Sequence, residues 1–170
     1  MADEWNALRE DLKRYPKRPW IRDQSAYVLA VHRYGRWADA LGGFRGRVAV
    51  KGYWLAYRIV ETVTGISLPK SVPVGPGCRI YHFGGIVIHD QARIGANCTL
   101  RHGITIGDRR PGGPVPVIED DVDIGAYAQI LGGVRVGSGA KIGAMSVVLV
   151  DVPPGATAVG NPARIIPARD

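Results

Sequence analysis

Hydrophobic positions along the chain follow two different spacings, which change near residue 65. In the first part, WNALREDLKRY places Trp5, Leu8 and Leu12 three and four residues apart, a spacing typical of an amphipathic helix. SAYVLAVHRYGRWADAL and VAVKGYWLAYRIVETVTG predict two further helices, separated by GGFRGR, and the second is expected to stop at Gly65. Residues 1–65 therefore predict a helical region.

Aliphatic residues then recur at every sixth position, interrupted by a two-residue slip between Ile86 and Ile88. The three series are Val74, Ile80, Ile86; Ile88, Ile94, Leu100, Ile106; and Ile118, Ile124, Ile130, Val136, Ile142, Val148. A period of six fits neither a helix nor ordinary alternating strands, and it predicts a hexapeptide solenoid. Stacked coils of such a solenoid bury a continuous column of side chains that no single coil could bury alone.

We expect the solenoid to occupy residues 66–152, with a C-terminal tail, 153–170, packing back along it. The stretch DRRPGGPVP, residues 108–116, keeps the phase but has loop chemistry, so it predicts a loop extruded from the coil. The expected fold class is mainly β, with an N-terminal α-helical region.

Two histidines hold the same place in this repeat. His82 stands two residues after Ile80, and His102 two residues after Leu100, so both are expected at one corner of adjacent coils about 4.8 Å apart. Two charged rings at this distance repel each other, which favours at least one neutral imidazole near neutral pH. A neutral imidazole is the form that a general base needs. The alternative is a pair of exposed corner histidines without a chemical role. By the same count, Cys78 and Cys98 are expected to stack as small core residues rather than to form a disulfide.

The chain carries a net charge of +7, with most of the excess in its helical part. No nucleic-acid-binding motif accompanies that charge, so a solvated basic face is favoured and no nucleic-acid partner is expected. No apolar run is long enough to span a bilayer, and the N-terminus lacks a signal-peptide pattern. These observations predict a cytoplasmic protein.

Three sequence segments within residues 64–166 resemble a known family: HFGGIVI, ARIGANCTLRHGITIGD and VDIGAYAQILGGVRVGSGAKIGAMSVVLVDVPPGATAVGNPARI. They resemble the hexapeptide acyltransferases, specifically the serine acetyltransferase branch, and VHRYGRW resembles that family's helical region. RHGITIGDR also resembles colanic-acid and other exopolysaccharide O-acetyltransferases. The resemblance implies a left-handed parallel β-helix and a homotrimer with active sites between subunits. It also implies acetyl-CoA as co-substrate.

Residue roles follow from the same resemblance. His82 falls on the family's catalytic base, which would take a proton from an acceptor hydroxyl, and His102 lies beside it. Arg109 matches the arginine that receives the carboxylate of serine. The pantetheine arm would run between subunits and contact Ala126, Ala144, Leu149, Val150 and Arg164, although these positions also suit ordinary coil and tail residues.

The chain departs from the serine acetyltransferase pattern at its acidic positions. The aspartate that orients the catalytic histidine is Ser67 here, and the aspartate before that histidine is Tyr81. The serine site's aspartate-proline falls loosely on Tyr15–Pro16. A histidine of the family becomes Arg110, so Arg109 and Arg110 form a doubly cationic loop that suits a carboxylate, a phosphate or a uronic acid.

Losing these carboxylates removes the natural partners of serine's ammonium group. We therefore expect an O-acetyltransferase whose acceptor is a sugar or another small hydroxyl compound, with serine O-acetyltransferase as the alternative. The expected catalytic residues are His82, His102 and Ser67. The expected substrate-binding residues are Arg109, Arg110, Tyr81 and Phe83.

Two other classes remain open. A gamma-class carbonic anhydrase uses the same solenoid and three histidines on zinc, but only His82 and His102 are well placed here, since His89 lies near the slip. We therefore expect no metal. A non-catalytic trimeric scaffold is the other alternative. By the resemblance to serine acetyltransferases, a complex with cysteine synthase would use a C-terminal tail that ends in isoleucine. This chain ends in ARD, so no such complex is expected.

Overall fold

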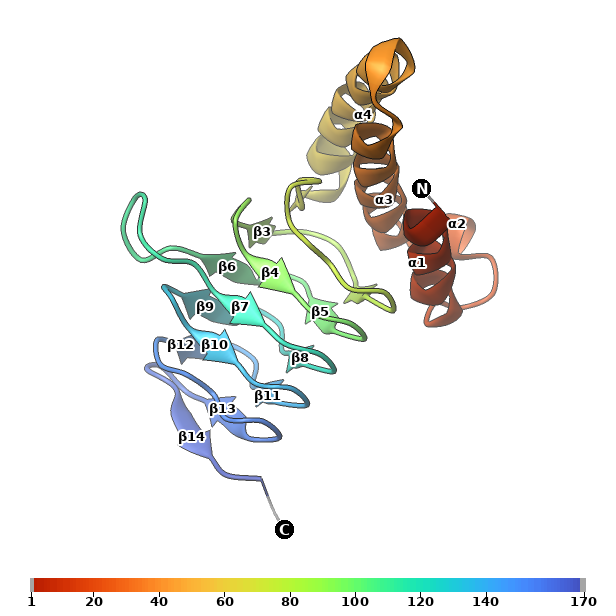
Figure 1. Cartoon of the computed structure of the whole chain (residues 1–170). Helices are drawn as coiled ribbons and strands as arrows, with labels where there is room; N and C mark the ends of the chain where they lie inside the picture. The colour runs from red at the N-terminus through yellow and green to blue at the C-terminus, as the bar shows by residue number, and fades with distance from the viewer. Residues whose placement is uncertain (1, 169–170) are drawn as a thin grey trace.

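The computed structural model describes residues 2–168 and contains a helical region followed by a β-solenoid (Figure 1). The helices lie at one end of the solenoid, and its coils stack away from them toward the C-terminus. The helices are α1 (Ala2–Lys13), α2 (Pro19–Arg22), α3 (Ser25–Leu41) and α4 (Gly43–Thr64). None of them has a stretch long and apolar enough to cross a membrane.

The α3–α4 connection is shorter than the sequence suggested. Residues 43–47 of the expected linker are helical, and Gly42 alone separates the two helices, with φ 63° and ψ 178°. Close packing explains why α4 extends so far, because the two helices contact each other along their length. At Gly35 a Cβ atom would overlap the ring of Tyr53, so the glycine lets α3 and α4 approach closely. The short helix α2 was not predicted.

Three sheets form the faces of the solenoid. Their orders are β1-β3-β6-β9-β12, β10-β7-β4 and β14-β13-β11-β8-β5-β2, and every pair is parallel except β13–β14. The five-stranded sheet indicates about five coils, and the left-handed parallel β-helix is confirmed. The strands are β1 (Ile66–Ser67), β2 (Arg79–Tyr81), β3 (Ile86–Ile88), β4 (Arg93–Ile94), β5 (Thr99–Arg101), β6 (Thr105–Gly107), β7 (Val117–Ile118), β8 (Asp123–Ile124), β9 (Gln129–Leu131), β10 (Arg135–Val136), β11 (Lys141–Ile142), β12 (Val147–Val148), β13 (Thr157–Val159) and β14 (Arg164–Ile166).

Strand register gives the length of each coil. Ile88 pairs with Ile106, a difference of 18 residues, which is the plain coil (106 − 88). Ile80 pairs with Leu100, 20 residues later, because the corner at 82–85 carries two additional residues. The slip therefore lies in the HFGG corner rather than between Ile86 and Ile88, both of which are buried strand residues. Leu100 pairs with Ile124, 24 residues later, because the loop at 108–116 adds six.

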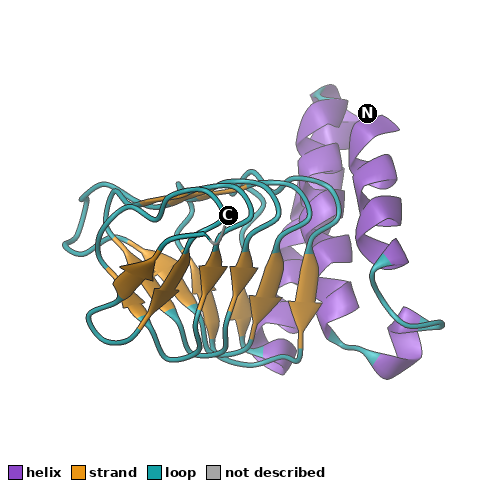
Figure 2. Ribbon diagram, turned by 90° about the horizontal axis from the view of Figure 1, so that it is seen from below, coloured by secondary structure: helices purple, strands orange, loops and turns teal. Residues whose placement is uncertain are grey.

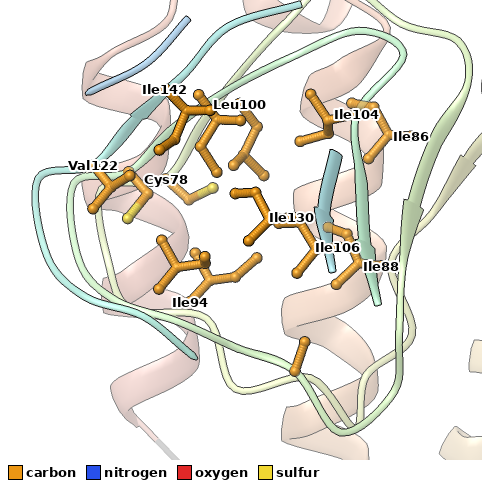
Figure 3. Packing of buried hydrophobic residues seen from close by; sticks show 14 of the residues in the cluster. Cys78, Ile86, Ile88, Ile94, Leu100, Ile104, Ile106, Val122, Ile130 and Ile142 are labelled. Carbon is orange, nitrogen blue, oxygen red and sulfur yellow. The ribbon is translucent and has the colours of Figure 1, made fainter. Parts of the chain in front are cut away.

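Aliphatic side chains from all three sheets fill the interior of the coils (Figure 3). The repeat positions are buried as predicted, and each fully buried aliphatic side chain contributes about 1.5–3 kcal/mol. Cys78 and Cys98 lie in this core as free thiols, so no disulfide joins them.

Side chains of the helices close the N-terminal edge of the solenoid. Arg33 of α3 is buried, and it donates to the carbonyl oxygens of Val74 and Gly75 at 2.7 Å each. Its Nε also donates to Asp11 of α1 at 3.0 Å, and the other oxygen of Asp11 accepts the backbone N–H of Cys78 at 2.8 Å. Backbone groups that would otherwise stand at an open sheet edge are thus satisfied.

Three further contacts of the same kind involve Arg14, Tyr15 and Ser25, the first residue of α3. The Ser25 hydroxyl donates to the carbonyl of Ile80 at 2.8 Å, and the hydroxyl of Tyr15 accepts the Ile80 N–H at 3.3 Å. Arg14 donates to the carbonyl of Gly77 at 2.6 Å. These contacts lie on either side of residues 21–24, the end of α2 and its link to α3, which we call the α2–α3 turn. They hold this turn near β2, the strand that leads to His82.

The C-terminal boundary differs from the expectation of a solenoid ending near residue 152. β13 pairs in parallel with β11, so the regular stack continues through Val159. Only β14 turns back, pairing antiparallel with β13. The Pro-rich stretch before β13 suggested an end, but Val152 still bridges to Val136 and keeps the coil in register.

Candidate active site

His82 and His102 lie side by side at the corner that joins the β2 and β5 face to the β3 and β6 face. Their ring centroids are 5.6 Å apart and the ring planes are nearly perpendicular, at 84°. The expected placement of the two histidines at one corner of adjacent coils is therefore confirmed, and their rings meet edge to face. His82 has φ 66°, an unusual left-handed conformation for a residue other than glycine, and it stands at the start of the enlarged HFGG corner. Its side chain is exposed.

A third ring continues the column. Tyr127 packs against His102 with centroids 5.0 Å apart at 81°. Gly103 permits this contact, because a Cβ atom there would overlap the Tyr127 ring. Within residues 2–168 the buried Nδ1 of His102 has no hydrogen-bond partner. His102 is thus held between two rings, and His82 is the accessible imidazole. Tyr127 was not singled out from the sequence, although the repeat places it one coil after Gly103.

Alanines occupy the same corner in the next two coils. The Tyr127 N–H donates to the carbonyl of His102 at 2.9 Å, and the Met145 N–H donates to the carbonyl of Ala126 at 2.8 Å. These bonds put His102, Ala126 and Ala144 at equivalent positions. The small side chains of Ala126 and Ala144 leave the corner backbone accessible below the histidines.

The other three expected cofactor contacts lie elsewhere on the chain. Leu149 and Val150 follow β12 and stand at the next corner of their coil. Arg164 lies in β14 and lines a cavity of about 660 Å³ near the C-terminus. One chain therefore does not gather all five residues around a single point.

Ser67 is held by a helix rather than by the histidines. It lies in β1 opposite Val87, and its hydroxyl is 3.1 Å from the hydroxyl of Tyr57, which donates to Glu61 at 2.9 Å. Within the described part of the chain, no hydrogen bond joins Ser67 to His82. Burial raises the pKa of Tyr57, so its phenol stays protonated. Tyr57 and Glu61 were not singled out from the sequence, where they read as ordinary helix residues.

Tyr81 and Phe83 flank His82 and are both partly exposed, by 40% and 51%. The Arg79 guanidinium lies over the Tyr81 ring, 4.4 Å from its centroid. Phe83 and His82 line a cavity of about 390 Å³ whose opposite wall consists of residues 21–24. The α2–α3 turn thus contributes to the surroundings of His82.

Arg109 and Arg110 lie on the loop between β6 and β7, which projects from the solenoid on the side away from the helices (Figures 1 and 2). Both are exposed and line a separate cavity of about 460 Å³ with residues of the β9–β10 corner. Arg109 packs across Gly132, where a Cβ atom would be 2.7 Å from its Cδ. Within one chain, the two arginines and His82 do not share a cavity.

His89, the third histidine considered for a metal, lies on a different corner, where its Nδ1 is 3.1 Å from Asp90. Within residues 2–168, no three His, Cys, Asp or Glu side chains are grouped as metal ligands.

Comparisons with known proteins agree with this fold. Residues 116–149 match the family model described as bacterial transferase hexapeptide (six repeats), and residues 85–109 match hexapeptide repeat of succinyl-transferase. No curated protein matches the chain.

Three solved structures illustrate the similarity. Serine acetyltransferase from Brucella abortus strain S19 has a TM-score of 0.84 at 29% identity, over 99% of this chain and 71% of that one. Serine acetyltransferase from Neisseria gonorrhoeae, solved in complex with serine, has a TM-score of 0.82 at 32% identity, over 98% and 70%. The soybean serine acetyltransferase apoenzyme has a TM-score of 0.81 at 31% identity, over 98% and 70%.

Proposed function

The chain belongs to the serine acetyltransferase family of hexapeptide-repeat acyltransferases, and from this premise we propose that it transfers an acetyl group from acetyl-CoA to a sugar hydroxyl, with His82 as general base. The observation that carries the proposal is the accessible His82 ring, which packs edge to face against His102. At the same corner, the next two coils carry alanines.

In the proposed reaction, an imidazole nitrogen of His82 accepts the proton of the acceptor hydroxyl as that oxygen attacks the thioester carbonyl carbon. The tetrahedral intermediate then collapses, the carbon–sulfur bond breaks, and the proton passes from the imidazolium to the sulfur of CoA. The products are an acetyl ester and CoA–SH. His102, packed between His82 and Tyr127, keeps the ring of the base in place.

The acceptor assignment rests on the charges around His82. A free amino acid offers an ammonium group, which needs a carboxylate partner. Among residues 2–168, Asp23 is the one carboxylate lining the cavity beside His82, and it already accepts hydrogen bonds from the Ser25 N–H and from Arg79. Tyr81 and Ser67 stand where the family pattern has aspartates. A sugar hydroxyl requires no such partner. Free serine is the second candidate, supported by the similarity to an enzyme solved with serine.

Release of CoA by the purified chain tests the proposal, with acetyl-CoA and either glycosides or free serine as acceptors. We expect turnover with glycosides and little with serine. His82→Ala should lower kcat by about 10²–10⁴-fold, the usual contribution of a general base. His89→Ala is the matched control, because this histidine lies on another corner.

The oligomeric state must be measured for each variant, so that a lost assembly is not mistaken for a lost base. Fast turnover with serine would replace the sugar by serine as acceptor. Full activity of His82→Ala would remove this residue from the mechanism.

A further inference from the structure

The cavity beside His82 lies between two parts of the chain that are far apart in sequence. Ile21, Arg22, Asp23 and Gln24 of the α2–α3 turn form one wall, and His82 and Phe83 of the enlarged corner form the other. Its volume of about 390 Å³ lies within the usual range of small-molecule sites. A ligand here would lie directly against the candidate base.

The wall formed by the α2–α3 turn is fixed in place. Asp23 accepts hydrogen bonds from the N–H of Ser25 at 3.1 Å and from Arg79 at 2.7 Å. Behind it, the Arg79 guanidinium lies 3.6 Å from the centroid of the Tyr15 ring. The Tyr27 hydroxyl donates to the carbonyl of Trp20 at 2.7 Å, which ties α2 to α3. Preorganised walls of this kind reduce the entropy lost on binding.

The chemistry of the lining is that of a site for one sugar ring. Phe83 is 51% exposed and Ile21 79% exposed, so the cavity offers apolar surface to water without a partner. A pyranose has an apolar C–H face that packs on an aromatic ring, and hydroxyl groups at its rim that need donors and acceptors. Gln24 supplies one of each.

Charge narrows the choice of sugar. The carboxylate of Asp23 is neutralised by Arg79, at 2.7 Å. Arg22 is exposed and forms no ion pair within residues 2–168, so it is the uncompensated charge of the cavity. An arginine fork pairs best with a planar carboxylate or a phosphate.

We propose that this cavity is the acceptor subsite, in which Phe83 stacks on a pyranose ring and Arg22 pairs with a carboxylate or phosphate carried by that sugar. The inference rests on the proposed acetyl transfer and adds to it where the acceptor binds and what charge it carries. Arg22 and Phe83 are thereby specificity residues for the acceptor, while His82 performs the proton transfer.

A binding experiment tests the subsite without relying on turnover. The chain contains four histidines, so their ring C–H signals are resolvable by NMR, and His82→Asn identifies the signal of His82. Methyl glucuronide, glucose 1-phosphate and methyl glucoside are the probes. We expect the first or second to shift the His82 signal more strongly than the neutral glucoside. Arg22→Gln and Phe83→Ala should weaken that response by about tenfold.

Matched controls are Arg9→Gln and Phe44→Ala, an exposed arginine and an exposed phenylalanine outside the cavity, which should leave the response unchanged. In acetyl transfer, the Arg22 and Phe83 variants should raise the KM of the acceptor while the KM of acetyl-CoA stays the same.

The outcomes separate the two claims. If His82 responds to an anionic sugar through Arg22 but no glycoside is acetylated, the proposed function is wrong and the subsite stands. If glycosides are acetylated while the Arg22 and Phe83 variants bind and react like the parent, the subsite is wrong and the function stands. An equal response to the neutral glucoside overturns the role of Arg22.

Discussion

A corner lined by alanine is the residue-scale feature that connects the histidines to the rest of the solenoid. Ala126 and Ala144 repeat the position of His102 one and two coils further on. If the pantetheine arm lies along this corner, a larger side chain should exclude it. We expect Ala144→Leu to raise the KM of acetyl-CoA at least about tenfold, with the KM of the acceptor unchanged. Ala40→Leu, at an exposed position of α3, is the control. Equal KM values for Ala144→Leu and the parent would place the arm elsewhere.

His32 makes a prediction about stability at the same scale. Burial lowers its pKa to about 3, from 6.5 for an ordinary histidine, and its Nε2 hydrogen-bonds the carbonyl of Val72 at 2.9 Å. As the pH falls, His32 is therefore protonated near pH 6.5 in the unfolded chain but only near pH 3 in the folded chain. The contribution of His32 to the free energy of unfolding is fully present above pH 6.5. Between pH 6.5 and about pH 3 it falls by about 1.4 kcal/mol for each pH unit.

Urea denaturation across this pH range measures the effect. His32→Gln cannot be protonated, so its free energy of unfolding should fall less steeply with acid than that of the parent. His89→Gln, at a partly exposed position, should keep the parental slope. Identical slopes for the parent and His32→Gln would show that His32 is not excluded from protonation in the folded state.

At the scale of elements, helices α1 and α3 serve as a cap for the first coil. Their buried Asp11–Arg33 pair binds the sheet edge, and burial raises the pKa of Asp11 even with Arg33 beside it. Arg33→Met should therefore cost about 3–5 kcal/mol of unfolding free energy, because it leaves a buried carboxylate alone. Lys13→Met breaks the exposed Lys13–Glu10 pair and should cost less than about 1 kcal/mol. Chemical denaturation compares the two, and equal losses would contradict the cap.

The contacts by which the helices cap the first coil could not be predicted from the sequence. Their periodicity indicated α1, α3 and α4, and Gly65 ended α4 as expected. The sequence did not indicate that Arg33 and His32 are buried, because a charged or polar residue in a helix suggests a solvent-exposed position unless its tertiary partner is known. Their partners are carbonyl groups of a strand edge some forty residues later. Helix α2 was missed for a similar reason, since a single turn after Pro19 has too few residues to show a period.

For the whole molecule, the repeat of six predicted the fold and the placement of His82 beside His102, because register in a solenoid is simple arithmetic. It could not indicate the cavity beside His82, half of which comes from the α2–α3 turn. Nor could it say which residues meet across subunits. Family resemblance supplied Arg109, and the structure puts Arg109 and His82 in different cavities of one chain.

Mixed oligomers test whether a neighbouring subunit brings these residues together. If a trimer places His82 of one subunit beside Arg109 of the next, chains with His82→Ala and chains with Arg109→Ala should each be inactive alone. Every trimer that contains both variants would then have about one intact site in three, because an intact site needs one chain of each kind in a given order. The two variants are co-expressed with different tags, the mixed trimers are isolated with both tags, and CoA release is measured. Trimers of each variant, mixed only after folding, are the control, since subunits that do not exchange cannot rebuild a site. If Arg109→Ala alone is inactive and the mixed trimers are inactive as well, the two residues do not meet between subunits. The loop at 108–116 then acts on the reaction in some other way.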